Sequence, residues 1–317
     1  MTGDALHIFE AERPRLTALA YRMLGERAAA EDVVQDAWLR WSVHSAAVEA
    51  PRAWLRQVTT RLAVDALRRA RARREHYVGP WLPEPIIAEV DEADGATQMA
   101  LAEECHLALL WAMERLGPED RAAFLLRRVF DADYAEIATT LGRSETACRQ
   151  MVSRAAARLR AARPRFAPDE GTVRVALERF AQAAMAQDHA TVLAMLAPDV
   201  TAISDGGGKA RAALRSLMGA AEVAQVILAV AAKAGPAAPR WVRANGAPAL
   251  AILEGGAEDV LYTLTLDPSG RIDWIYIMRN PDKLLNAVRA LGDYSGLSMP
   301  RLSVGTDPRI APCPDPR

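Results

Sequence analysis

Residues 133–160 contain the side chains best suited to chemical recognition. The segment reads DYAEIATTLGRSETACRQMVSRAAARLR, and glutamine, serine and threonine lie between its arginines. Arginine and glutamine can each make two hydrogen bonds to the edge of one base, and serine or threonine can adapt to either partner. The sequence therefore predicts DNA contacts by Arg143, Ser144, Thr146, Arg149, Gln150, Ser153 and Arg154.

Two short helices would hold these side chains in position. The first carries apolar Ile137 and ends at Gly142, and Ser144 is a favourable N-cap for the second. In the second helix, apolar residues recur at steps of four, three and four, which forms one buried stripe of Cys148, Val152, Ala155 and Leu159. This pattern is typical of a helix-turn-helix, whose second helix enters the major groove. The alternative is an ordinary helical hairpin with a solvated basic face.

A second basic segment occupies residues 51–75. Pro51 suits the first turn of a helix, and apolar residues follow at three- and four-residue steps, at Leu55, Val58, Leu62 and Ala66. The other face of this helix carries Arg56, Arg61, Arg68 and Arg69. Such a face suits phosphates, so binding to it would weaken as salt is added.

An acidic helix is predicted near the N-terminus, in the segment AEDVVQDAW. Its exposed polar face would carry Glu31, Asp32, Gln35 and Asp36, while Val33, Val34, Ala37 and Trp38 would offer apolar contacts to a partner. A surface helix with no special role is the alternative.

The composition and motifs argue against a secreted, membrane-spanning, metal-binding or P-loop protein. The 317 residues have a formal net charge of −1, but the charges are arranged in strongly basic and strongly acidic blocks. The three cysteines lie far apart, and no ligand spacing suggests a metal site. No signal peptide or membrane span is apparent, so we expect a cytoplasmic protein. The segment SDGGGKAR lacks the first glycine of a phosphate-binding loop, because Ile203 occupies that position.

Periodicity and turn residues divide the chain into parts. Helices are expected at 4–24, 28–42 and 51–75, followed by an extended, proline-rich stretch and an acidic tether. A second helical domain would begin near residue 98. After residue 170, a helix at 172–187 precedes the alternating segments APALAILEG, VLYTLTLD and IDWIYIMRN, which predict strands. The proline-rich C-terminus is expected to be a mobile tail.

The chain resembles a known family in three respects. The segments YRMLGERAAAEDVVQDAWLRW (21–41) and PRAWLRQVTTRLAVDALRRARARRE (51–75), together with the helix-turn-helix, resemble extracytoplasmic-function sigma factors. The motifs WLPEP (81–85), DGGGK (205–209) and NPDKL (280–284) are similar to those of the subgroup with a SnoaL-like C-terminal extension. The resemblance implies a multidomain fold with two all-α domains and an α+β SnoaL-like cone. The expected parts are sigma region 2 at 4–75, a linker at 76–97, sigma region 4 at 98–165, the SnoaL-like domain at 170–290 and the tail at 291–317.

The resemblance also implies a function, which is to bind core RNA polymerase and direct it to promoters. The acidic helix would dock on the β′ clamp of the polymerase, and the β flap would be a further contact. The helix at 51–75 would hold the separated strand of the minus-ten element through Trp54, Arg56, Arg61, Arg68 and Arg69. Trp54 could equally be a core residue. The helix-turn-helix would read the minus-thirty-five element.

The C-terminal extension is expected to regulate the rest of the chain in place of a separate anti-sigma factor, without a membrane partner. We expect contacts among the three motifs, with no catalytic residue, cofactor or metal. Some SnoaL-like relatives use an acid and a histidine in catalysis. Here His189 is the only histidine of the extension, and Asp205, Asp259 and Asp273 have no evident partner. The alternatives are a conventional helix-turn-helix regulator and a SnoaL-like enzyme fused to a DNA-binding region. The regulatory residues would be Trp81, Leu82, Pro83, Glu84, Pro85, Asp205, Gly206, Gly207, Gly208, Lys209, Asn280, Pro281, Asp282, Lys283 and Leu284.

Overall fold

A computed structural model describes residues 2–89, 107–162, 169–233, 239–253 and 258–292. Residues 293–317 of the predicted tail, most of the acidic tether and the start of the helix expected from residue 98 lie outside these residues. No described helix is both long enough and apolar enough to span a membrane.

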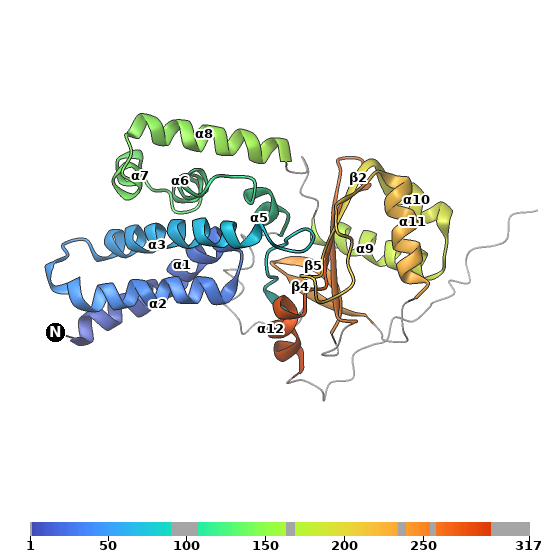
Figure 1. Cartoon of the computed structure of the whole chain (residues 1–317), viewed down its shortest axis with the longest axis horizontal. Helices are drawn as coiled ribbons and strands as arrows, with labels where there is room; N and C mark the ends of the chain where they lie inside the picture. Colours follow the sequence, from blue (N-terminus) through green and yellow to red (C-terminus); the bar gives the residue numbers. More distant parts are fainter. Residues whose placement is uncertain (1, 90–106, 163–168, 234–238, 254–257, 293–317) are drawn as a thin grey trace, which may run out of the picture.

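The N-terminal helical domain is a bundle of three helices (Figure 1). All three predicted helices are present, and Pro51 lies in the first turn of the third, where its missing N–H is harmless. Leu55 and Leu62 are buried in the shared core, whereas Val58 and Ala66 pack on it partly buried. The helices are α1 (Thr2–Leu24), α2 (Arg27–His44) and α3 (Pro51–Arg74), and a short 3-10 helix, η1 (Ser45–Ala47), follows α2.

The helix-turn-helix domain contains the predicted motif. Gly142 adopts φ of 64° and ends the first helix of the motif, and the Ser144 hydroxyl accepts a hydrogen bond from the Ala147 N–H at 3.2 Å. The predicted stripe from Cys148 to Leu159 is buried. The helices are α5 (Leu107–Met113), α6 (Pro118–Arg128), α7 (Tyr134–Leu141) and α8 (Glu145–Ala162).

The C-terminal domain combines helices with a mixed sheet, so the expected α+β class is confirmed. The sheet has the strand order β1-β4-β5-β6-β7-β2-β3, and β2 pairs with β7 in parallel, while the other pairs are antiparallel. The elements are α9 (Glu170–Met185), α10 (His189–Met195), β2 (Leu196–Asp205), β3 (Leu217–Met218), α11 (Ala220–Ala231), β4 (Arg240–Ala244), β5 (Ala247–Ile252), β6 (Val260–Leu266), β7 (Ile272–Met278) and α12 (Pro281–Gly292).

The linker contributes one strand to this sheet. Residues after WLPEP form β1 (Ile87–Glu89), which pairs antiparallel with β4 and places Ile87 opposite Ala244. The sequence indicates an extended linker here but does not predict this strand. An open sheet edge offers unpaired backbone groups, and a short extended segment of the same chain satisfies them here.

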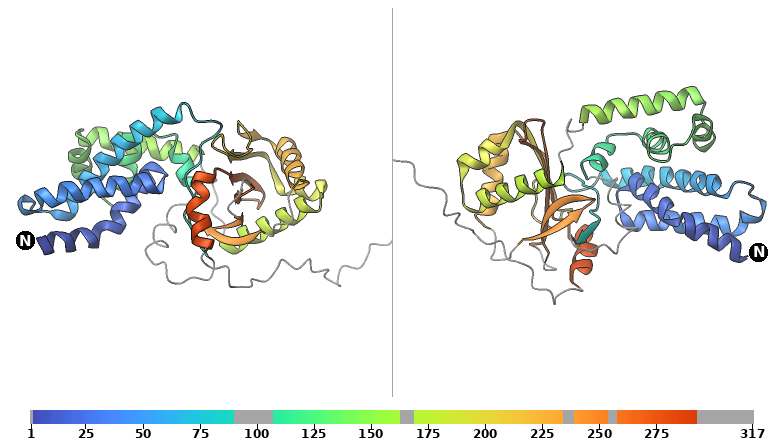
Figure 2. Two further views of the ribbon diagram at one scale, coloured as in Figure 1. Left: turned by 60° about the horizontal axis from the view of Figure 1, so that its bottom comes forward. Right: turned by 180° about the vertical axis from the view of Figure 1, so that it is seen from behind.

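Both faces of the sheet are buried. Along β7, Ile275 and Ile277 pack with α9, α10 and α11, whereas Trp274, Tyr276 and Met278 point to the opposite face, as the two-residue period of a strand requires. The second face shares a hydrophobic core with the linker, α5 and the N-terminal helical domain. Figures 1 and 2 show α9 to α11 on the side of the sheet away from both helical domains.

The glycine-rich turn after β2 brings the chain close to the last helix. Gly207 and Gly208 have φ of 59° and 72°, a backbone conformation that residues with a Cβ rarely adopt. A Cβ on Gly207 would also meet the side chain of Asn280, whereas Gly270, with φ of 81°, has open space around it.

We expect Gly207→Ala to destabilise the protein more than Gly270→Ala. Both substitutions incur the left-handed backbone penalty of about 1–2 kcal/mol, but only the first forces Asn280 to move. The steric contribution should add roughly 1–3 kcal/mol. Denaturant unfolding of the two variants measures the difference, and equal losses of stability would contradict this assignment.

Candidate nucleic-acid and interdomain interfaces

The predicted DNA-reading residues lie on the exposed side of the helix-turn-helix. The buried stripe fixes the other side of α8 against α6 and α7. The seven exposed candidates are Arg143, Ser144, Thr146, Arg149, Gln150, Ser153 and Arg154. Their placement matches what a recognition helix needs, while their contact with bases stays a prediction.

Several of these arginines already have acidic partners within the chain. Arg143 donates to Glu119 at 3.0 and 3.1 Å, and hydrogen bonding by Arg143 lowers the pKa of the Glu119 carboxyl group. Arg154 donates to Asp120 at 3.1 Å. Both acids lie in the first turn of α6, where the helix dipole also favours negative charge.

The basic face of α3 lies against the helix-turn-helix domain. Arg56 donates to Glu136 at 2.7 Å, and Arg61 donates to the backbone carbonyls of Thr140 and Thr139, at 2.8 Å each. Two further candidates complete this face, namely Arg68, which donates to Glu119 at 2.7 Å, and the exposed Arg69. The basic face of α3 is therefore in contact with α6 and α7, and Glu119 joins Arg68 of this face to Arg143 of the helix-turn-helix.

Trp54 is both a core residue and part of a cleft. Its ring packs against Trp41 with a centroid separation of 5.6 Å and is partly buried. It also lines a cleft of about 600 Å³ between the loop after α2 and helix α7, together with Glu136 and Thr139.

The predicted polymerase-binding face is exposed, but part of the prediction is wrong. Glu31, Asp32, Gln35 and Asp36 all face solvent. The apolar residues expected to accompany them, Val33, Val34 and Ala37, are buried in the core, since the helical period turns them inward, and Trp38 packs partly buried on Phe9. The exposed apolar residues of this helix are Leu39 and Val43 instead.

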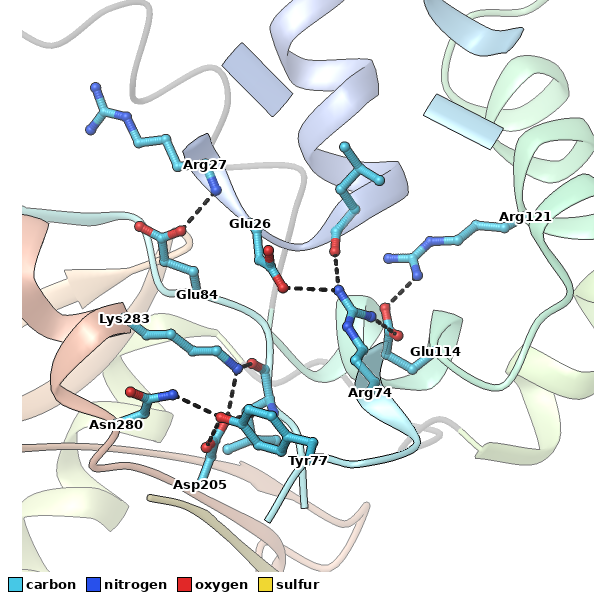
Figure 3. Close-up of polar contacts among 12 residues, drawn as sticks. Glu26, Arg27, Arg74, Tyr77, Glu84, Glu114, Arg121, Asp205, Asn280 and Lys283 are labelled. Carbon is cyan, nitrogen blue, oxygen red and sulfur yellow. Dashed lines mark hydrogen bonds and ion pairs between the residues drawn. The ribbon is translucent and has the colours of Figure 1, made fainter. Parts of the chain in front are cut away.

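The three motifs meet around one buried ion pair (Figure 3). Lys283 of NPDKL lies 2.7 Å from Asp205 of DGGGK, and both are buried. The Leu82 N–H of WLPEP donates to Asp205 at 2.8 Å, and the Leu82 carbonyl accepts from Lys283. Burial lowers the pKa of Lys283, and Asp205 opposes this shift. The expectation that Asp205 lacks a partner is therefore wrong.

Tyr77 and Asn280 extend this polar cluster. The Tyr77 hydroxyl donates to Asp205 at 2.6 Å and accepts from the Asn280 amide at 2.7 Å. Burial, followed by the hydrogen bond to Asp205, raises the pKa of Tyr77, so its hydroxyl keeps its proton. The Asn280 side chain also caps α12 by accepting from the Asp282 N–H at 3.0 Å, with Pro281 in the first turn.

The other residues of DGGGK and NPDKL either pack against the core and the linker or form contacts at the surface. Leu284 is fully buried in the core shared with the linker, and a Cβ on Gly208 would lie 3.2 Å from Val78. A Cβ on Gly206 would clash with the Ala210 carbonyl, so this position needs glycine. A second ion pair, between Lys209 and Asp282 at 2.6 Å, is largely exposed.

Trp81 lies between the N-terminal and C-terminal domains. The guanidinium of Arg74 stacks 3.3 Å from the centre of its ring, and the Lys283 ammonium lies 4.2 Å away. Such cation–π contacts are strongest when the cation is shielded from water. A Cβ on Gly25 would lie 2.7 Å from the same ring, so the N-terminal domain packs tightly against Trp81.

Glu84 connects the linker to the start of α2. Its carboxylate accepts from the Arg27 N–H at 2.8 Å and from the Asn286 amide of α12 at 3.0 Å. The residue at the N-cap position of α2, Glu26, makes no side-chain capping bond, so the cap comes from a distant residue. Pro83 and Pro85, on either side of Glu84, are buried.

Sequence reasoning missed five residues that take part in the contacts among the N-terminal helical domain, the linker and the C-terminal domain. They are Tyr21, Arg74, Tyr77, Asn245 and Asn286. Tyr21 donates to the Glu84 carbonyl at 2.6 Å and accepts from Asn245 at 2.8 Å. The one available signal was the lack of a favourable N-cap residue before α2, which indicated that a cap must come from elsewhere.

The residues that an enzyme would use are not arranged as a free acid–histidine pair. His189 is exposed at the start of α10, while Asp205 is committed to Lys283, Tyr77 and the Leu82 N–H. Asp273 accepts a hydrogen bond from Thr265. The space left between the linker and one face of the sheet is about 10 Å³, and its lining includes Leu82, Pro83, Leu261, Thr263, Tyr276 and Met278.

Comparisons with known proteins agree with this architecture. Residues 8–73 match the family model Sigma-70 region 2, and residues 106–159 match Sigma-70, region 4. The ECF RNA polymerase sigma factor SigJ of Mycobacterium tuberculosis is 42% identical over 229 residues, which cover 72% of this chain and 73% of the relative. The probable ECF RNA polymerase sigma factor SigI of the same species is 36% identical over 197 residues, which cover 61% of this chain and 67% of the relative. The crystal structure of SigJ superposes with a TM-score of 0.73 at 34% identity, covering 88% of this chain and 98% of that chain.

We expect the buried ion pair to matter far more for stability than the exposed one. Lys283→Met leaves the Asp205 charge buried beside it, which should reduce the free energy of unfolding by about 3–5 kcal/mol. Lys209→Met removes an exposed partner and should cost about 0–1 kcal/mol. Chemical denaturation of both variants checks the contrast, and similar values for the two would contradict it.

Proposed function

The chain belongs to the ECF RNA polymerase sigma factors, and we propose that its C-terminal domain regulates it from within by holding the linker between its two helical domains. The protein is a sigma factor that binds RNA polymerase and directs transcription initiation at promoters. Its N-terminal helical domain is region 2 and its helix-turn-helix domain is region 4.

The polymerase would be bound by the exposed acidic face of α2. Glu31, Asp32, Gln35 and Asp36 supply charge for a basic partner, which we assign to the β′ clamp, and the exposed Leu39 lies on the following turn. Region 4 would contact the β flap. These partners place the action of the protein in the cytoplasm.

The promoter would be bound at two sites. Arg56, Arg61, Arg68 and Arg69, with Trp54, would hold the separated minus-ten strand, since single-stranded DNA is bound by cations for its phosphates and aromatic rings for its bases. The exposed face of α8 would read the minus-thirty-five element in the major groove.

One observation supports regulation by the C-terminal domain more than any other. The backbone N–H and C=O of Leu82 are both bonded to the Asp205–Lys283 pair, while Trp81 stacks on Arg74 of region 2. The linker is therefore held on one side by the C-terminal domain and on the other by region 2. A change in the C-terminal domain would alter how far regions 2 and 4 can separate.

This arrangement supports a regulatory domain without catalysis. The linker and α5 cover one face of the sheet and leave little space between the linker and that face for a substrate. We propose further that this covalently attached domain takes the place of a separate anti-sigma factor. A conventional helix-turn-helix regulator would act without supplying promoter specificity to core polymerase, and this difference can be tested directly.

Run-off transcription with purified core polymerase tests the main proposal. Promoter-specific transcripts from genomic fragments should appear only when the protein is added. Arg149→Ala should lower transcription from the preferred promoter by about tenfold or more, because a bidentate base contact contributes roughly 1–3 kcal/mol of discrimination. Absence of specific transcripts with the intact protein would refute the assignment.

Substitutions in the linker test the regulatory role. The double change Trp81→Ala and Leu82→Ala should alter promoter-specific transcription several-fold, because it removes the contacts that join the linker to both neighbours. Leu285→Ala, at a half-exposed position on α12, is the matched control and should leave transcription unchanged. Far-ultraviolet circular dichroism reports whether the helical domains stay folded. A parallel loss of helix content and transcription would mean that WLPEP has only a structural role.

A further inference from the structure

Helix α2, which carries the predicted polymerase-binding face, begins without a capping side chain of its own. Glu26 occupies the N-cap position but makes no side-chain capping bond, and its carboxylate accepts from Arg74 at 3.2 Å instead. The first N–H groups of a helix have no partner inside the helix, so an acceptor from elsewhere must satisfy them. The residue that supplies this acceptor therefore helps to position the first turn of α2.

Glu84 of WLPEP supplies the missing acceptor and is bonded to the turn between α1 and α2 through its backbone as well (Figure 3). Its carboxylate accepts from the Arg27 N–H at 2.8 Å. Its own N–H donates to the Gly25 carbonyl at 2.8 Å, and its carbonyl accepts from the Tyr21 hydroxyl at 2.6 Å. A carboxylate also suits the positive end of the helix dipole. Glu84, which is only 7% exposed, thus holds the start of α2 in one geometry.

The capped turn leads directly into the acidic face of α2. The Arg27 side chain donates to Glu31 at 3.0 Å, so one residue receives the cap on its backbone and contacts the acidic face with its side chain. Asp32 follows Glu31 in the chain. Charges across an interface fix its register, so displaced carboxylates would fit a basic partner less well. A shift of the first turn of α2 would therefore weaken docking at this face.

The C-terminal domain holds Glu84 from the other side. The second carboxylate oxygen of Glu84 accepts from the Asn286 amide of α12 at 3.0 Å. Asn245, in the turn between β4 and β5, donates its N–H to the Ile86 carbonyl at 2.8 Å and accepts from the Ile86 N–H at 3.0 Å. The Asn245 amide also donates to the Tyr21 hydroxyl at 2.8 Å. Asn245 is fully buried, so water does not compete for these bonds.

We propose that Glu84 is a positioning residue for polymerase binding, because it caps α2 from the linker and is held in place by Asn245 and Asn286 of the C-terminal domain. The linker motif then acts on the affinity of the chain for core polymerase, before any promoter is bound. This inference rests on the proposed function, since it takes the acidic face of α2 as the polymerase contact.

Substitutions at Glu84 test this role through the affinity of the full chain for purified core polymerase. Glu84→Ala should weaken binding about fivefold, which is the effect expected from the loss of one helix cap. Glu84→Gln keeps an acceptor for the Arg27 N–H and should bind within about twofold of the parent protein. Hydrogen exchange in the first turn of α2 should be faster in the alanine variant and unchanged in the glutamine variant.

Asp188→Ala is the matched control, because it also removes a helix cap. The Asp188 carboxylate caps α10 by accepting from the Thr191 N–H at 3.0 Å and from the Thr191 hydroxyl at 2.6 Å. Helix α10 lies on the side of the sheet away from both helical domains, so its cap should not affect polymerase affinity. If both alanine variants lost affinity equally, Glu84 would have only a structural role.

Asn245→Gly tests the support that the C-terminal domain gives to Glu84. Asn245 and Gly246 have φ of 51° and 75° and form a two-residue hairpin turn, in which glycine is accommodated at both positions. The substitution therefore keeps the turn but removes the side chain that bonds Ile86 and Tyr21. Polymerase affinity should fall about threefold, since two buried hydrogen bonds are lost. Affinity equal to that of the parent protein would contradict the proposal, and this variant decides the question if Glu84→Ala does not fold.

A substitution in the acidic face itself separates failure of this inference from failure of the proposed function. Asp32→Ala combined with Asp36→Ala should weaken polymerase binding about tenfold or more, because it removes charges from the contact itself. If this variant binds normally, the assignment of α2 to polymerase fails and the inference fails with it. If it binds weakly while Glu84→Ala binds like the parent protein, only the inference is refuted.

Discussion

The buried pair of Lys283 and Asp205 is the interaction on which the arrangement of the chain depends. Charges removed from water are tolerated only when their hydrogen-bonding capacity is satisfied. The C-terminal domain supplies both charges, but Leu82 of the linker supplies one of the acceptors and one of the donors. The hydrogen bonding of the pair is therefore complete only when the linker is in place, and release of the linker would remove a donor from Asp205 and an acceptor from Lys283.

The placement of the two helical domains follows from this contact. The linker continues from Leu82 into β1 and covers the sheet face that α9 to α11 leave open. Helix α5 covers the same face through Trp111, whose ring lies 4.6 Å from that of Trp274. Regions 2 and 4 thus share one hydrophobic core with the sheet, and Arg74 joins them near its edge by contacting both Glu26 and Glu114.

Local sequence signals were sufficient for the helices of the N-terminal domain and for the helix-turn-helix, but not for every element of the C-terminal sheet or for the contacts between domains. The helical period, Pro51, Gly142 and Ser144 predicted the helices and the turn of the DNA-binding motif, since each of these features acts within a few residues. Arg56 and Glu136 are 80 positions apart, and nothing local indicates that they meet. The same limit explains why β1 was missed and why Asp205 was thought to lack a partner. Roles in DNA or polymerase binding remain predictions for every residue concerned.

These contacts give a second explanation for the charge pattern of the sequence. A net charge near zero, made of separate basic and acidic blocks, is ambiguous in sequence, because arginines placed for phosphates also attract carboxylates of the same chain. Here Glu119 and Glu136 form ion pairs with Arg68 and Arg56 of α3, so part of the basic face that suits DNA is already paired with carboxylates of the same chain. Added salt weakens these ion pairs and DNA binding alike.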